Sequence, residues 1–351
     1  MTADAFEVIA SDEATLSPAF IAVASEPSFA PARTMIRALF TKLGDRDGNF
    51  RQQLQTSGFD PRVWELCLFA YLEEAGFELD RRYATPDFVV SRGVASLAIE
   101  ATTANLSAGD DPAEYLPESV DTILEHLTQR LPIKLGSPLY SKLTKRYWEL
   151  PQVVGRPLIF AIESFAGGQS LWFSESSLVS YLYGSRSVAW HLADGSLRVV
   201  PVPLDEHHHG PKRIPSGFFA TPDAEHVSAV IFSNSGTVAK LNRMGAQSRV
   251  GCEAITRMFR VGLAYDHAPD AAVPKLFHYQ IGEHQETWGE GLSVIHNPRA
   301  LFPVDESLFP GTAQYFADGE TIYAHMPAFH PFGSVTYTFL RSDDDGPREP
   351  A

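Results

Sequence analysis

The sequence predicts an α/β fold with a strand-rich C-terminal extension, and three observations support this prediction. Between residues 36 and 190, helical and extended segments alternate along the chain. One extended segment, residues 157–165 (PLIFAIESF), is almost entirely apolar, as expected of a strand whose two faces are both covered. After residue 190, short extended runs separated by Gly, Pro, Asn and Asp replace the alternation.

The first elements follow from local signals. Asp60 and Pro61 form an N-cap and first-turn pair, and Gly76 ends the helix that is expected over residues 61–75. Three extended runs then form a meander, and the turn at residues 91–93 joins the last two of them. We expect these strands at residues 77–83, 86–90 and 94–102.

Two further helices precede the apolar strand at residues 157–165. Apolar residues recur at helical spacing over residues 117–131, which predicts a helix with a single apolar stripe. A second helical piece is expected from Pro138 to about Leu150. The first half is thus predicted to place helices on a sheet.

The second half is predicted to share or extend the sheet of the first, because no linker of flexible composition separates them. Its expected strands are residues 197–202, 226–233, 256–265, 276–281, 292–296 and 334–340. The predicted organisation is a peripheral N-terminal segment (1–35), a core (36–190), a strand-rich extension packed on that core (191–340) and a disordered tail (341–351).

Composition and charge narrow the classes of function. The 351 residues are 44% hydrophobic and 20% charged, which excludes wholesale disorder. There are 28 basic and 43 acidic residues, so the formal net charge is −15. Such a charge opposes non-specific binding to phosphate polymers. A nucleic-acid partner would therefore need a local basic patch.

Cysteine usage and the N-terminal residues predict a cytoplasmic protein with no membrane segment. Cys67 and Cys252 lie far apart in the chain, which argues against a disulfide framework and favours a reducing compartment. The first twenty residues carry acids where a signal peptide needs a basic start. No run approaches the ~18 apolar residues of a membrane-spanning helix.

Three carboxylates of the first half are placed so that they can form a cluster. Glu65 lies on an apolar face of its predicted helix, where an unpartnered charge is costly. Asp87 begins one strand of the predicted hairpin and Glu100 lies near the end of the other, within about two positions of it across the turn. Two hard oxygen ligands at the fork of a hairpin suit Mg²⁺, which completes its shell with water and phosphate oxygens.

The order of these motifs resembles the PD-(D/E)XK nuclease superfamily of restriction endonucleases, junction resolvases and repair nucleases. The resemblance covers about residues 61–165: a helix with a glutamate, a strand, PDFVV, and IEAT thirteen residues after the aspartate. It implies a restriction-endonuclease-like central mixed sheet flanked by helices, one or two Mg²⁺ (or Mn²⁺) ions, and hydrolysis of phosphodiester bonds in DNA or RNA. By motif position, Asp87 and Glu100 would bind metal, and Glu65 would bind a second metal or hold a water.

The family pattern places a lysine where this chain has Thr102, and a hydroxyl cannot supply its positive charge. Some members of the superfamily recruit the lysine from a following helix. Residues 130–146 contain several basic residues and no acid. We expect Lys142 to be the substitute, with Lys145 next. The basic residues expected to contact nucleic acid are Lys134, Lys142, Lys145 and Arg146.

These features also have plainer interpretations. An aspartate after proline, such as Asp87, often caps a turn because its side chain accepts hydrogen bonds from nearby backbone amides. The basic stretch is consistent with a solvated surface on which Lys145 pairs with Glu149. Residues 207–209 are three histidines that would point in different directions from a loop, which makes them a weak metal candidate. Glu163 is a weaker fourth acidic candidate.

The sequence therefore predicts a Mg²⁺-dependent phosphodiesterase acting on DNA or RNA. A nuclease-like fold that has lost catalysis and serves as a binding or assembly subunit is the first alternative, since Thr102 and the acidic net charge favour it. The second is a metal-dependent hydrolase of a small phosphorylated molecule, which would need no extended basic groove.

Overall fold

The computed structural model describes residues 4–9, 15–45, 48–105, 120–165 and 170–341. These residues form a central sheet of eight strands in the order β1-β2-β3-β4-β9-β12-β13-β14. The strands are β1 (Glu78–Leu79), β2 (Phe88–Arg92), β3 (Ala95–Asn105), β4 (Leu158–Phe165), β9 (Val227–Ser233), β12 (Leu292–His296), β13 (Ala313–Asp318) and β14 (Thr321–His325). The sheet is mixed: β3, β4 and β9 are parallel, whereas β2 and β12 run antiparallel to their neighbours β3 and β9.

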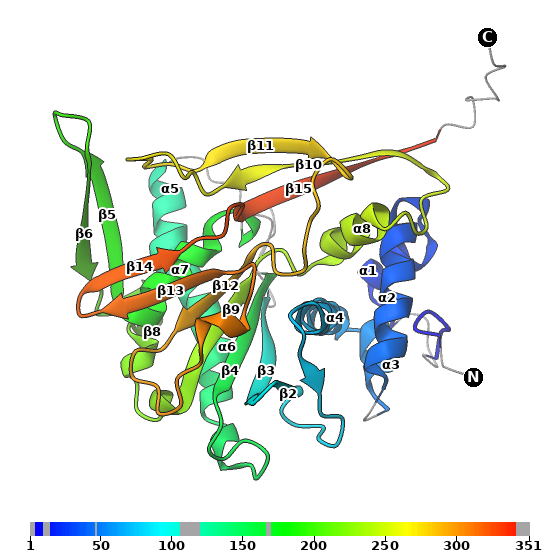
Figure 1. Ribbon diagram of the computed structural model, residues 1–351, viewed down its shortest axis with the longest axis horizontal. Coiled ribbons are helices and arrows are strands. Elements are labelled where there is room, and N and C mark those ends of the chain that lie inside the picture. The colour runs from blue at the N-terminus through cyan, green and yellow to red at the C-terminus, as the bar shows by residue number, and fades with distance from the viewer. Residues whose placement is uncertain (1–3, 10–14, 46–47, 106–119, 166–169, 342–351) are drawn as a thin grey trace.

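Helices cover both faces of this sheet, which confirms the predicted α/β class. Because side chains alternate along a strand, Leu97 and Ile99 of β3 enter one core while Ala98 and Ala104 enter the other. The first core is covered by α1 (Pro18–Ser25), α2 (Ala30–Leu43), α3 (Phe50–Gln55), α4 (Phe59–Glu74) and α8 (Val238–Gln247). The opposite side carries α5 (Val120–Glu125), the π-helical segment η4 (His126–Arg130), α6 (Leu131–Leu143) and α7 (Ser170–Tyr183). Figure 1 shows α2, α4 and α8 together beside the central strands.

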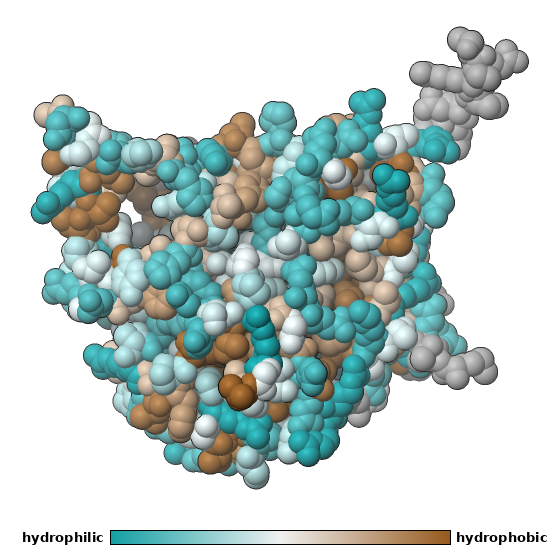
Figure 2. All heavy atoms as spheres, in the orientation of Figure 1, coloured by the Kyte–Doolittle hydropathy of each residue, from teal (hydrophilic) through white to brown (hydrophobic). Residues whose placement is uncertain are grey.

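The second half adds smaller β structures to the shared sheet. An antiparallel three-stranded sheet is formed by β11 (Lys275–Gln280), β10 (Ile255–Ala264) and β15 (Pro331–Leu340). Two hairpins are formed by β5 (Ser185–His191) with β6 (Leu197–Pro203), and by β7 (Glu206–His209) with β8 (Lys212–Pro215). The β5–β6 hairpin projects from the body of the molecule, and brown apolar side chains are visible on it in Figure 2. Trp190 and Val199 are large apolar residues of this hairpin that are exposed.

A buried network of ion pairs joins the three-stranded sheet to α8. Arg243 of α8 binds both oxygens of Glu286 through Nε and NH2, at 2.8 and 2.9 Å. Lys240 and Arg260 each lie 3.4 Å from the same carboxylate. Arg260 of β10 also contacts Glu290. These side chains are almost completely buried, so the network forms a polar joint inside the molecule.

Short 3₁₀ turns complete the chain. They are η2 (Pro27–Phe29), η5 (Tyr147–Glu149), η6 (Phe218–Ala220), η7 (Ala224–His226) and η8 (Glu306–Leu308). No helix within the described residues is both long and apolar enough to cross a lipid bilayer.

The structure confirms most of the predicted strands and the predicted sharing of the sheet, since β1–β4 come from the first half and the remaining strands of the central sheet from the second. The expected strand at residues 77–83 is reduced to Glu78–Leu79. Residues 1–35 are not merely peripheral where they are described. Phe20, Val23 and Ala32 are buried because α1 and the start of α2 pack into the first core, on one face of the central sheet. The predicted tail at residues 342–351 lies outside the described residues.

The predicted boundary between the helices of residues 117–131 and 138–150 is wrong. One helix, α6, continues through Pro138 and ends at Leu143, and η5 follows it separately. A proline in a helix removes one backbone hydrogen bond, and here the tertiary packing of Leu135, Leu139 and Leu143 outweighs that loss. Residues 117–119 lie outside the described part.

Candidate active site

The β2–β3 hairpin places Asp87 beside Glu100. Phe88 pairs with Ile99, so Asp87, one residue before β2, comes opposite Glu100 of β3. The Asp87 backbone N–H donates to Glu100 Oε2 at 3.3 Å, and Asp87 Oδ2 accepts a hydrogen bond from the Ala101 N–H at 2.8 Å. Gly93 in the connecting turn has φ +59°, a conformation that glycine adopts without steric cost. The predicted convergence of the two carboxylates is thus present.

Lys142 supplies a positive charge to this pair. Its ammonium contacts Glu100 Oε1, and the Tyr147 hydroxyl donates to the same oxygen at 2.6 Å. The contact forms because the last turn of α6 lies over β3 on the face to which Glu100 points. Glu100 and Lys142 are 8% and 18% exposed, so water screens their interaction only in part. Lys142 therefore places a positive charge directly beside Glu100.

Glu65 approaches the cluster from α4. Its Oε2 atom accepts from Arg62 at 2.5 Å, and Glu65 and Asp87 line the same cavity of about 60 Å³. Burial raises the pKa of Glu65, the charge of Glu100 raises it further, and the Arg62 and Lys142 cations oppose the increase. All three predicted carboxylates are thus electrostatically coupled.

Around Asp87, the negative charges of the carboxylates outweigh the positive charges of the neighbouring cations. Burial raises the pKa of Asp87 well above its usual range, and the neighbouring charges of Glu65 and Glu100 add to the effect. Burial and Glu100 also raise the pKa of Tyr147, which keeps its hydroxyl a donor. A proton or an added cation would relieve the repulsion between the acids.

The donors are of the kind that Mg²⁺ prefers. Within the described residues, no three His, Cys, Asp or Glu side chains are grouped as ligands of one metal ion. Mg²⁺ needs fewer, because one or two carboxylates suffice when water and phosphate fill the remaining positions. The adjacent carboxylates of Asp87 and Glu100, the raised pKa of Asp87 and a small cavity beside it fit such an ion.

The other predicted basic residues do not join the acids. Lys145 and Arg146 are exposed beyond the end of α6, and Arg146 pairs with Glu149 at 2.9 Å. The expected Lys145–Glu149 pair is therefore replaced by an i,i+3 pair, because the helix ends at Leu143 and Arg146 takes a left-handed backbone conformation. Lys134 lines a different pocket, next to the β7–β8 hairpin.

The weaker metal candidates lie elsewhere. Glu163 of β4 is completely buried, and its Oε2 accepts from the Gly236 N–H at 3.1 Å. His207 is also buried, and its Nδ1 and Nε2 atoms lie 2.7 Å from the Thr128 carbonyl oxygen and 2.9 Å from Ser216 Oγ. Both ring nitrogens are thus used in holding the hairpin, which leaves none for a metal.

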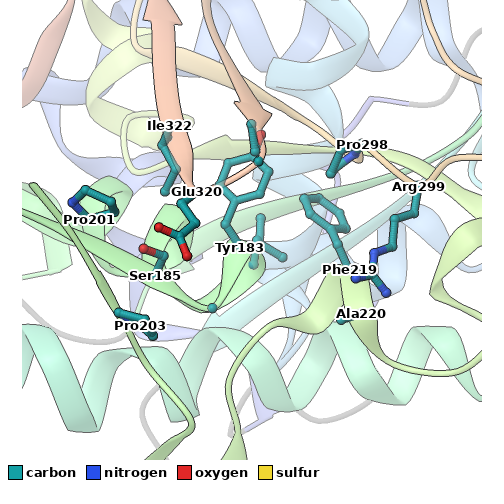
Figure 3. Close-up of a pocket in the computed structure, with 14 residues that line it drawn as sticks. Tyr183, Ser185, Pro201, Pro203, Phe219, Ala220, Pro298, Arg299, Glu320 and Ile322 are labelled. Atoms are coloured by element: carbon teal, nitrogen blue, oxygen red, sulfur yellow. The ribbon is translucent and has the colours of Figure 1, made fainter.

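A larger pocket lies away from the acidic cluster. It has a volume of about 360 Å³ and lies between the end of α7, the β5–β6 hairpin and β14. Figure 3 shows Tyr183, Phe219 and Ile322 around it, together with the charged side chains of Arg299 and Glu320. The described lining is mostly apolar and offers no pair of carboxylates for metal-assisted hydrolysis.

One residue of the site, Tyr147, was missed by sequence reasoning. It follows the basic stretch as the first residue of η5, and no recurring spacing marks it. Tyr147 reaches Glu100 because the chain turns back over β3 after Lys142, which no local pattern indicates. Comparison of the chain with protein-family models, with curated proteins and with solved structures returns no match. The geometry described above is therefore the basis for assigning a function.

Proposed function

We propose that this protein is a Mg²⁺-dependent nuclease with a restriction-endonuclease-like core, which hydrolyses phosphodiester bonds in DNA or RNA. One observation carries the proposal: the Lys142 ammonium contacts Glu100, which is paired across the hairpin with Asp87. A strand carboxylate, a second carboxylate and a lysine are thereby combined even though the strand itself carries Thr102 in place of a lysine.

Each residue of the cluster has a chemical role in this proposal. Asp87 and Glu100 would hold the cation, which when bound would polarise a phosphate oxygen and lower the pKa of water. Lys142 orients the attacking water and offsets charge as it develops on the phosphate. Glu65, which interacts electrostatically with Asp87 and Glu100, holds a second water. The water oxygen forms a bond to phosphorus and gives up a proton to solvent, one ester bond breaks, and the departing oxygen takes up a proton from solvent.

Cleavage assays with matched variants test the proposal. Purified protein should nick plasmid DNA or degrade labelled RNA when Mg²⁺ or Mn²⁺ is present. Asp87→Asn and Lys142→Ala should each reduce the rate by at least about 100-fold, the usual effect of losing a group that acts in the transition state. Asp80→Asn is the control, because it makes the same chemical change at a more exposed aspartate paired with Arg82. Equal rates for wild type and Asp87→Asn would refute the assignment.

A second candidate is a nuclease-like binding or assembly subunit without catalysis. It is favoured by the contacts of Glu100, since Lys142 and Tyr147 already share its Oε1 atom. Isothermal titration with Mg²⁺ and Mn²⁺ separates the two functions. Binding that is lost in Asp87→Asn supports the nuclease, whereas no binding at millimolar metal favours the subunit.

A further inference from the structure

The three-stranded sheet formed by β11, β10 and β15 has two faces with different surroundings. Arg260 Nε donates to Ser334 Oγ at 2.8 Å, and its NH1 donates to the Tyr279 hydroxyl oxygen at 3.0 Å, so these three side chains share the inner face. Phe259 of β10 and Tyr337 of β15 are cross-strand partners one position away from Arg260. Because side chains alternate along a strand, this pair lies on the opposite, outer face.

Aromatic rings are grouped on that outer face and are open to solvent. Tyr337 is 53% exposed and Phe339, two residues along β15, is 52% exposed. The Phe259 ring lies edge to face with the Phe339 ring, and their centroids are 6.0 Å apart. Half-exposed rings gain only part of the free energy that burial would give, and grouped exposed apolar residues mark interaction surfaces. The surface formed by Phe259, Tyr337, Phe339 and the neighbouring Arg257 is called the aromatic face below.

The charge of this sheet has the opposite sign to that of the whole chain. Its three strands contain Arg257, Arg260 and Lys275 but no aspartate or glutamate, whereas the chain has a formal net charge of −15. Arg257 is exposed, is paired with Phe339 across the strands, and has no ion-pair partner among the described residues. A second copy of the chain would bring like charges to this face. A polyanion would bring the complementary ones, so charge favours nucleic acid as the occupant.

Flat rings on an open sheet suit the unpaired bases of a single strand. Every base has a π-face, and stacking on aromatic side chains is therefore tolerant of sequence. In a duplex the base faces are covered by neighbouring base pairs. The three-stranded sheet lies at the top of Figure 1, whereas β2 and β3, which carry the candidate active site, lie at the bottom. The rings would thus hold a part of the strand that is distant from the bond to be cut.

We propose that the aromatic face binds a single-stranded segment of nucleic acid, whose unpaired bases stack on Tyr337, Phe339 and Phe259 while Arg257 contacts a backbone phosphate. The inference rests on the proposed function, which it deepens by naming a single-stranded segment as part of the substrate. Base stacking supplies the affinity, and the guanidinium supplies a salt-dependent contact.

Binding assays in EDTA test this inference without requiring catalysis. The probes are fluorescein-labelled oligothymidylate and oligouridylate, a DNA duplex of the same length, and an abasic strand that has the phosphates but no bases. Fluorescence anisotropy should show that the abasic strand binds at least about tenfold more weakly than the single strand that the protein prefers. Tyr337→Ala and Phe339→Ala should each weaken binding to that strand about tenfold and leave duplex and abasic binding unchanged.

Further variants separate the ring from its apolar character and its charged neighbour. Tyr337→Phe should retain the affinity, whereas Tyr337→Leu, which is apolar but has no ring, should lose as much as Tyr337→Ala. Arg257→Ala should lower the salt slope by about 0.7, as expected for the loss of one contact to a single-strand phosphate. Tyr323→Ala is the control, because it removes a tyrosine of similar exposure, 45%, from β14 of the central sheet.

The outcomes distinguish this inference from the proposed function. Cleavage by the wild type, with equal single-strand binding by wild type and Tyr337→Leu, would overturn the aromatic face and leave the nuclease intact. Binding that depends on the rings, without cleavage in Mg²⁺ or Mn²⁺, would support the aromatic face and overturn the nuclease. A wild type that binds neither single strand would overturn the aromatic face. So would a dimer in sedimentation velocity that Tyr337→Ala converts to a monomer, because a second copy would then cover this face.

Discussion

At the scale of single residues, the acidic cluster illustrates how a charge can be supplied from a different element. Glu100 and Thr102 share a strand face, so a lysine at position 102 would stand beside the carboxylate. Lys142 reaches Glu100 from α6 instead, and Tyr147 adds a donor at 2.6 Å. A buried carboxylate is stable only with such partners, which means that the contacts of Glu100 have a structural value in addition to any catalytic one.

Glu163 gives the protein a pH-dependent stability. Burial raises the pKa of Glu163 to about 8, and the Ser233 hydroxyl and Gly236 N–H only partly oppose this. The folded state therefore binds a proton more tightly than the unfolded state does, in which the pKa is near 4.5. The stabilising effect is complete below pH 4.5 and is lost as the pH rises through 8. We predict that wild type loses a few kcal/mol of unfolding free energy over this interval through Glu163.

The variant Glu163→Gln isolates that effect. Its amide keeps an oxygen to accept from Gly236 but does not titrate, so urea midpoints measured at pH 5, 6.5 and 8 should vary less than in the wild type. Asp80→Asn serves as the control, since Asp80 is held by Arg82 near the surface. Parallel pH profiles for wild type and Glu163→Gln would contradict the prediction.

At the scale of elements, the sequence predicted those whose signals are local. The strands β9 and β12 are buried along their whole length and β4 is buried except at its last residue, and their apolar runs identify them. The helix α8 was missed because Lys240, Asn242 and Arg243, residue types that are usually exposed, make up much of its buried surface. Those residues are buried only because partners distant in sequence satisfy them, which a local pattern cannot show.

For the candidate site too, the sequence predicted what depends on local pairing and missed what depends on distant packing. Asp87 and Glu100 lie on one hairpin, so strand pairing alone predicted their approach. Lys142 could be selected because it lies in a basic stretch without acids, but its contact depends on how α6 packs on β3. The pocket that Lys134 lines could not be predicted, since His209 and Lys212, which also line it, follow Lys134 by more than seventy residues.

The packing of α6 against α7 predicts an unusual effect of a helical glycine. Replacing glycine by alanine inside a helix usually stabilises it by about 1 kcal/mol. A Cβ atom at Gly136, however, would lie 2.5 Å from Cζ of Tyr181 on α7. Gly136→Ala should therefore destabilise the protein by roughly 1–3 kcal/mol, as overpacking does. Thermal unfolding checks this, with Ser141→Ala, at an exposed position of the same helix, as the control.

A double variant identifies the cause. If the tyrosine ring is the obstacle, Tyr181→Ala should lose less stability in the Gly136→Ala background than in the wild type, because the two side chains compete for one space. Gly136→Ala that is as stable as the wild type, or additive with Tyr181→Ala, would show that α6 and α7 do not approach as closely as the structure indicates.

At the scale of the whole molecule, the two halves of the sequence form one folding unit. The first four strands of the central sheet come from the first half, and the last of them, β4, pairs directly with β9 from the second. The three-stranded sheet is attached through the buried network around Glu286. Burial alone would raise the pKa of Glu286, but Arg243, Arg260 and Lys240 hold it well below its usual range. The network therefore stabilises the fold as long as the Glu286 carboxylate is there to pair with its cations.

Removing that carboxylate should destabilise the whole molecule and not one part of it. Glu286→Ala leaves Lys240, Arg243 and Arg260 buried together without their shared partner, which should cost about 3–5 kcal/mol. Glu149→Ala breaks an exposed pair with Arg146 and should cost less than about 1 kcal/mol. Urea unfolding followed by tryptophan fluorescence and by far-UV circular dichroism measures both. Because the sheet is shared, the two signals should change in one coincident transition in every variant. A separate early transition in Glu286→Ala would show instead that the three-stranded sheet unfolds independently of the central one.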